Sequence, residues 1–114
     1  MFKFKTQQKI FQIGKIKIGG QPGELPKVLI GTIFYQKQNI VKNPKEGVFD
    51  KQKAEELIKK QEELSDITGN PCGVDIVCTS FESGCKYINF VSEMTDTPIL
   101  IDVWKPDIKI KMLN

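Results

Sequence analysis

The stretch GGQPGELPKVLIGTIFY, residues 19–35, decides the fold class of this chain. Its first half is a loop broken by glycine and proline, and its second half contains a short apolar segment at residues 28–34. That segment is apolar on both faces, which is typical of a parallel strand covered by helices on both sides. We therefore predict a buried parallel strand at residues 28–34, reached through a loop.

Two further apolar segments, at residues 74–78 and 99–103, alternate with sequences of helical character. Asp50 and Ser80 precede the two helical sequences and are typical N-cap residues, and Gly69 ends the first helix. Strand, helix, strand, helix, strand is the order of right-handed βα units and a parallel sheet. Periodicity alone does not distinguish a doubly wound sheet from part of a (βα)8 barrel.

The segments that flank these units are more polar. Two isoleucine-rich runs at residues 9–18, with Gly14-Lys15 between them, predict a β-hairpin with a tight turn. Residues 36–48 contain turn signals and predict a long loop, and residues 106–112 are a candidate third helix. Apolar side chains at helical spacing predict the buried helix faces: Ala54, Leu57, Ile58, Leu64 and Ile67 in the first helix, and Phe81, Cys85, Tyr87, Ile88, Phe90, Val91 and Met94 in the second.

The composition excludes several kinds of chemistry. The 114 residues form one domain at most, they include no histidine, and all 17 basic residues are lysines. No imidazole is therefore available as a base, and no guanidinium is available for bidentate phosphate binding. The net charge of +3 with dispersed lysines does not indicate nucleic-acid binding, and no segment is apolar enough to span a membrane.

The cysteines indicate packing rather than a metal site. Cys72, Cys78 and Cys85 are separated by five and six residues, which fits neither a zinc site nor a disulfide framework. Reduced, buried cysteines in a cytosolic protein are the simplest interpretation. Cys78 ends a strand, but no neighbour in the sequence would activate its thiol, so we interpret it as a packing residue rather than a nucleophile.

In either α/β architecture, functional residues lie at the carboxyl ends of the strands. Asp102 is the sharpest candidate because it is a carboxylate that follows three apolar residues. It either accepts hydrogen bonds from a heterocycle with N–H groups or caps a turn or helix. Asp75 lies inside an apolar strand, where it needs a hydrogen-bond partner or a polar cavity. Trp104 either stacks on a ligand or covers apolar surface.

A series of ordered motifs resembles one known family. The motifs are GGQPGE at residues 19–24, VLIGTIFY at 28–35, FDK at 49–51, QEELSD at 61–66, TGNPC at 68–72, VDIV at 74–77, KYINFVSE at 86–93 and LID at 100–102. In sequence and spacing they are similar to the H subunit of tetrahydromethanopterin S-methyltransferase. The similarity extends over about residues 8–109.

The resemblance implies a fold and a reaction. Family members are (βα)8 TIM barrels that move a methyl group from N5 of methyl-tetrahydromethanopterin to a corrinoid cobalt on a partner protein. This chain would then be a partial barrel and a single incomplete domain at residues 1–114. Residues 9–18 would form the N-terminal hairpin, and residues 28–114 would form βα units 1–3, the βαβαβ core.

The resemblance also implies a site and partners. In the wider set of pterin-binding barrels, a carboxylate at the end of the third strand binds the pterin. By that likeness Asp102 is the pterin ligand, Asp75 is the aspartate of the second strand, and Thr32 lies near the first-strand contacts. The chain itself would bind no cofactor, because the pterin is the substrate and the corrinoid belongs to the partner subunit. The setting would be archaeal methanogenesis or other one-carbon metabolism, in the cytoplasm, at the periphery of a membrane-associated complex.

A non-enzymatic interpretation stays open. The chain would then be a truncated paralogue or an interaction module that keeps the βαβαβ core without turnover. Val103 and Trp104, which replace small hydroxyl residues of the family, favour this alternative. In either case the apolar strand at residues 99–103 would be an open sheet edge, so we expect a homo-oligomer or a partner chain that completes the barrel.

Overall fold

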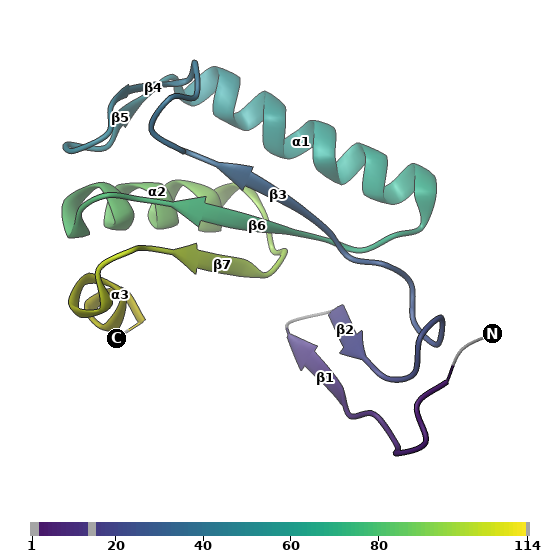
Figure 1. Ribbon diagram of the computed structural model, residues 1–114. Helices are drawn as coiled ribbons and strands as arrows, with labels where there is room; N and C mark the ends of the chain where they lie inside the picture. The colour runs from purple at the N-terminus through teal and green to yellow at the C-terminus, as the bar shows by residue number, and fades with distance from the viewer. Residues whose placement is uncertain (1–2, 14–15, 114) are drawn as a thin grey trace.

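The computed structural model describes residues 3–13 and 16–113, and Figure 1 shows how its elements are arranged. In chain order the elements are β1 (Ile10–Ile13), β2 (Ile16–Gly19), β3 (Leu29–Ile33), β4 (Val41–Asn43), β5 (Val48–Phe49), α1 (Lys51–Thr68), β6 (Cys72–Val77), α2 (Phe81–Met94), β7 (Ile99–Asp102) and α3 (Pro106–Leu113). The structure therefore confirms an α/β chain in which parallel strands alternate with helices after an N-terminal hairpin.

The central sheet has the strand order β3-β6-β7, and both of its strand pairs are parallel. β6 is thus the middle strand, and β3 and β7 form the two edges of the sheet. Within the described residues the sheet does not close into a barrel. The hydrophobic core lies between one face of this sheet and the helices α1 and α2 (Figure 1).

The capping residues set the helix boundaries as the sequence predicts. α1 follows Asp50, whose carboxylate accepts a hydrogen bond from the Lys53 amide at 3.1 Å. It ends at Gly69, where φ is 76°, a left-handed conformation that glycine adopts without a steric penalty. α2 follows Ser80, whose Oγ accepts a hydrogen bond from the Ser83 amide at 3.1 Å. All three predicted boundaries are confirmed.

An aromatic cluster forms the centre of the core. The rings of Phe34 and Tyr87 are stacked with centroids 4.1 Å apart and an interplanar angle of 4°. Phe49 packs edge-on against both rings. Val74 and Ile76 of β6 face this cluster and are almost fully buried. The cluster therefore joins β3, β6 and α2 into one unit.

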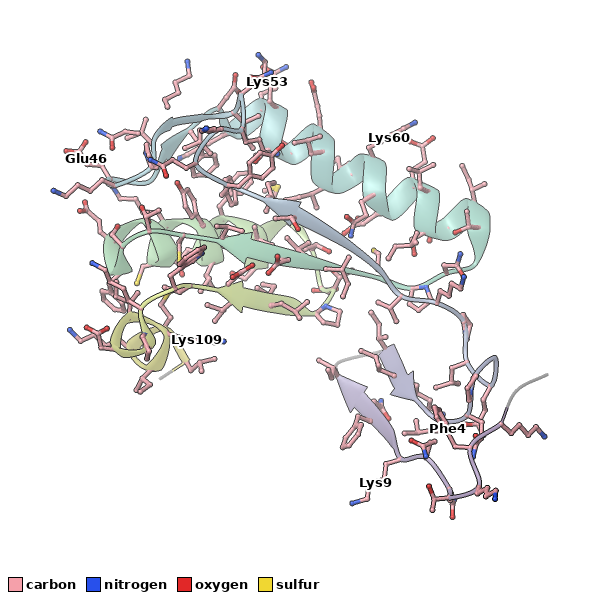
Figure 2. The ribbon with its side chains drawn as sticks, viewed as in Figure 1. Phe4, Lys9, Glu46, Lys53, Lys60 and Lys109 are labelled. Atoms are coloured by element: carbon pink, nitrogen blue, oxygen red, sulfur yellow. The ribbon has the colours of Figure 1, made fainter. Side chains whose placement is uncertain are left out.

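Burial differs from the sequence prediction because the described helices cover only one face of the sheet. The strand predicted to be covered on both sides is half open, since the Ile30 side chain is 50% exposed. The predicted helix faces are also too broad: Leu57, Leu64, Ile67 and Phe81 are all exposed. The burial of α1 is concentrated at Ala54 and Ile58, and that of α2 at Ser83, Gly84, Tyr87 and Val91. On the outer side of α1, Lys53 and Lys60 project away from the sheet (Figure 2).

The hairpin of β1 and β2 is antiparallel, as predicted, and lies near the amino-terminal ends of the sheet strands (Figure 1). Its predicted turn, Gly14-Lys15, lies outside the described residues. Ile16 of β2 is 7% exposed. Together with Pro71 and Pro98, which precede β6 and β7, it lines a cavity of about 380 Å³. The hairpin and the amino-terminal end of the sheet therefore enclose this cavity together.

The segment before α1 and the C-terminal segment also form regular structure. Residues 36–48, predicted as a loop, contain β4, which pairs with β5 in a small antiparallel sheet. The candidate third helix is present as α3, which packs beside α2 and β7 (Figure 1).

Candidate functional site

The candidate site lies on the face of the sheet that α1 and α2 do not cover. Side chains alternate along a strand, so the core residues Val74 and Ile76 place their neighbour Asp75 on the opposite face. The parallel register sets Thr32 beside Asp75 and Asp102 beside Val77. This surface, which we call the open face, consists of Ile30, Thr32, Asp75, Val77, Leu100 and Asp102. Its polar residues are Thr32, Asp75 and Asp102, and its apolar residues are Ile30, Val77 and Leu100.

The structure brings the predicted residues Thr32 and Asp75 together. They are directly paired across β3 and β6, and the Thr32 hydroxyl donates a hydrogen bond to Asp75 Oδ2 at 3.3 Å. Asp102 lies on β7 at the carboxyl end of the sheet, where its backbone oxygen accepts a hydrogen bond from the Cys78 amide at 3.3 Å. Three strands therefore contribute one polar side chain each to the same face.

Asp75 and Asp102 interact as a carboxylate pair. Partial burial is the main cause that raises the pKa of Asp75, and the negative charge of Asp102 raises it further. The hydrogen bond from Thr32 lowers the pKa of Asp75. Since burial and the neighbouring charge together outweigh it, Asp75 retains its proton more readily than an isolated aspartate does.

Cys78 does not belong to the open face. Its side chain is 3% exposed, and its Sγ lies 3.4 Å from Sδ of Met112 on α3. Burial raises the pKa of the Cys78 thiol to about 11, with smaller contributions from Cys85 and Asp102. A thiol with this pKa is almost entirely protonated at neutral pH and is a poor nucleophile. The interpretation of Cys78 as a packing residue is confirmed.

The exposure of Trp104 separates it from the packing residues. It follows β7 two positions after Asp102, and 93% of its side chain is exposed. It therefore does not cover apolar surface within the described part of the chain. Among the described residues, no group of three or more cysteine, aspartate or glutamate side chains is placed to hold a metal ion.

A cavity elsewhere in the structure does not coincide with the carboxylate pair. About 700 Å³ of space lies between α1 and the segment after β3, lined by Tyr35, Lys37, Gln38, Asn39, Ile40, Lys53, Glu56, Leu57 and Lys60. Neither Asp75 nor Asp102 lines it. We place the candidate site on the open face, where hydrogen-bonding side chains converge, because cavity size alone does not identify chemistry.

Among the described residues, no helix is long and apolar enough to cross a bilayer.

Comparison with known families identifies the chain's relatives. The family model of the tetrahydromethanopterin S-methyltransferase MtrH subunit matches residues 6–114. The chain belongs to this family. The MtrH family assignment agrees with the motifs from GGQPGE to LID, which extend over the same region.

Individual members of the MtrH family are similar in sequence to this chain over most of its length. The H subunit of tetrahydromethanopterin S-methyltransferase from Methanothermobacter thermautotrophicus is 49% identical over 114 residues, which is 100% of this chain and 37% of the relative. The corresponding protein from Methanocaldococcus jannaschii, which has the same name, is 50% identical over 102 residues, or 90% of this chain and 32% of the relative. The chain thus spans about a third of the length of these curated relatives and corresponds to their N-terminal part.

Proposed function

We propose that the open face is half of a pterin site in a partial (βα)8 barrel. The carboxylate pair on adjacent parallel strands of an MtrH-family chain is the observation that carries this proposal. In a (βα)8 barrel the helices lie outside the strands, and the uncovered face of the sheet lines the interior. The order β3-β6-β7 with both helices on one face fits the first three units of such a barrel.

The same proposal covers the organisation of the whole chain. Residues 1–114 are one incomplete barrel domain, in which residues 9–18 are the hairpin and residues 28–114 are βα units 1–3. The burial of Ile16 and the cavity that it lines with Pro71 and Pro98 support a hairpin that covers the bottom of a barrel. The candidate site is at the other end, where (βα)8 enzymes bind their substrates.

The proposed roles follow from the chemistry of the side chains. Asp102 accepts hydrogen bonds from the amine and ring N–H groups of the pterin through its carboxyl oxygens. Asp75 lies next to it and keeps a proton more readily than an isolated aspartate. Thr32 orients Asp75 through its hydroxyl. The three side chains thus form a row of hydrogen-bonding groups across the three strands.

The proposed reaction is transfer of a methyl group from N5 of methyl-tetrahydromethanopterin. The C–N5 bond breaks, its electron pair stays on N5, and N5 takes up one proton. A corrinoid on a partner subunit accepts the methyl group and supplies the nucleophilic electron pair. In this proposal Asp75 supplies the proton to N5, because its raised pKa favours the protonated form. In this proposal the chain works beside the corrinoid-carrying subunit of a membrane-associated complex, on the cytoplasmic side.

Calorimetric titration of the chain with tetrahydromethanopterin tests the site. We expect binding in the micromolar range, and we expect Asp102→Asn to weaken it about 10- to 100-fold, the range for loss of a charged hydrogen-bond partner. Asp66→Asn, on the exposed surface of α1, is the matched control and leaves binding unchanged. Equal affinity of wild type and Asp102→Asn would remove Asp102 from the site.

A second candidate function is a non-catalytic interaction module. The open face and the two edge strands favour it, because they offer surface to another chain. Methyl transfer to free cob(I)alamin separates the two functions. Turnover above a protein-free control would exclude the non-catalytic module, whereas absence of both turnover and pterin binding would favour it.

A further inference from the structure

Trp104 is exposed to an extent that is unusual for its size. Its side chain is 93% accessible to solvent, and it is the only tryptophan among the 114 residues. Tryptophan carries a large apolar surface, and exposing it to water is unfavourable unless the ring has a partner in the functional state. The exposure of this ring therefore requires an explanation.

Trp104 follows the carboxyl end of β7, where the open face ends. Ile99, Ile101 and Val103 are half-buried, and Ile99 and Val103 pack against the core cluster. Leu100, Asp102 and Trp104 are the exposed residues that alternate with them. Asp102 is the last residue of β7, and Trp104 lies two residues later in the bend that precedes α3. The exposed indole is therefore at the carboxyl-end rim of the sheet, within reach of a ligand held by the Asp102 carboxylate.

We propose that Trp104 is a positioning residue that stacks on the ring of a planar heterocycle held by Asp102. This inference rests on the proposed pterin site and adds the contact that its hydrogen bonds do not provide. Carboxylates bind the N–H edge of a heterocycle but leave its faces in water. An indole beside the carboxylate covers one face, and stacked aromatic pairs are favourable beyond the apolar area that they bury.

Asp75, Asp102 and Trp104 together also define the class of ligand. Asp75 and Asp102 require a ligand with hydrogen-bond donors, and Trp104 requires a flat π-system that extends from those donors. The ligand is therefore a fused or single aromatic or partly aromatic heterocycle with N–H groups at one edge. An acyclic cation would satisfy the carboxylates and gain much less from the indole plane.

Because the chain has one tryptophan, its emission reports on this contact directly. The probe is tetrahydromethanopterin, titrated while indole emission and calorimetric heat are recorded on the same samples, with free N-acetyltryptophanamide as the correction for light absorbed by the pterin. We expect indole emission to fall in step with the calorimetric binding curve. We expect Trp104→Leu to weaken binding about 2- to 12-fold, and Trp104→Phe to retain most of it, because phenylalanine still stacks.

Phe11→Leu is the control variant. Phe11 is an aromatic residue that is 61% exposed, but it lies on the β1–β2 hairpin at the opposite end of the strands. We expect its affinity and emission change to match the wild type. Circular dichroism of each variant establishes that the fold is retained.

The two readouts distinguish failure of this inference from failure of the proposed function. Calorimetric binding with unchanged indole emission, or with equal affinity in Trp104→Leu, would overturn the role of Trp104 and leave the pterin site intact. Absence of binding heat in the wild type would overturn the pterin site, and the stacking contact with it. Weakening by Trp104→Leu that Trp104→Phe does not restore would also overturn stacking, since it would indicate a contact specific to the indole N–H.

Discussion

At the scale of single residues, the hydroxyl group of Tyr87 is the least satisfied polar atom of the described core. The side chain is 1% exposed and stacks on Phe34, yet its hydroxyl has no hydrogen-bond partner among the described residues. Burial is also the main cause that raises the pKa of Tyr87. A buried, unpaired hydroxyl costs free energy that phenylalanine avoids.

We therefore predict that Tyr87→Phe increases the free energy of unfolding by about 1 kcal/mol. The stacked ring is retained, and the desolvation cost of the hydroxyl is removed. Urea denaturation of wild type and variant measures the change. Tyr35→Phe is the control, because Tyr35 is 45% exposed. Destabilisation by Tyr87→Phe would show that the hydroxyl has a partner, such as a buried water.

The carboxylate pair predicts a dependence of stability on pH. Because the pKa of Asp75 is raised in the folded state, its contribution favours folding below the ordinary aspartate pKa and is lost as the pH rises through the raised value. We predict that Asp75→Asn increases stability at neutral pH by roughly 0.5–1 kcal/mol, a small value because solvent screens a partly exposed pair. The gain should disappear in acid.

Urea denaturation at several pH values tests this prediction, with Asp66→Asn as the exposed control. If Asp75→Asn is less stable than the wild type at neutral pH, the hydrogen bond from Thr32 outweighs the repulsion from Asp102.

The sequence predicts which polar residues share the site but not how they interact. Thr32, Asp75 and Asp102 each lie in or at the end of an apolar segment, so their strand positions can be predicted. The hydrogen bond between Thr32 and Asp75 depends on the register between β3 and β6, which tertiary packing sets. The exposure of Trp104 likewise depends on which faces the helices cover, and periodicity does not contain that information.

At the scale of elements, Ser80 connects α2 to the small β4–β5 sheet. Its Oγ accepts from the Ser83 amide and donates to the Lys45 carbonyl at 2.6 Å. Ser83 completes a capping box with the Ser80 backbone. The Lys86 ammonium adds a hydrogen bond to the Glu46 carbonyl at 2.8 Å. One N-cap side chain therefore satisfies the helix and holds the turn that precedes β5.

We predict that Ser80→Ala decreases the free energy of unfolding by about 1–2 kcal/mol, the upper part of the range for loss of an N-cap, because the contact with Lys45 is lost as well. Thermal and urea denaturation measure the change. Ser92→Ala is the matched control on the same helix, since exposed Ser92 only donates to the Asn89 carbonyl. Equal stabilities of the two variants would contradict the capping role.

The elements themselves could be predicted better than their buried faces. Asp50, Gly69 and Ser80 act locally, so the helix boundaries follow from the sequence. Burial is a property of the assembly, and exposed Leu57 and Leu64 show that α1 has more apolar surface than the described sheet covers. An amphipathic pattern thus indicates which face can pack, and the available neighbours decide how much of it does.

At the scale of the whole molecule, the shape indicates surface that is suited to association. The radius of gyration is 15.8 Å, whereas a compact chain of this length has a value of about 13 Å. Hydrogen bonds to Pro98 and Asp102 join β7 to β6, so the alternate residues Ile99 and Ile101 direct their backbone groups to the open edge. The adjoining open face exposes Ile30 and Leu100.

We predict that the chain self-associates as its concentration rises, because an apolar face beside an open edge tends to pair with another chain. The weight-average sedimentation coefficient should increase over a concentration series. Leu100→Lys should shift this increase to higher concentration, since it places a charge on the open face. Val48→Lys is the matched control, because Val48 is as exposed as Leu100, at 44%, but lies on β5. A monomer that unfolds cooperatively at every concentration would contradict this prediction, and an equal effect of both lysine variants would assign association to general repulsion rather than to the open face.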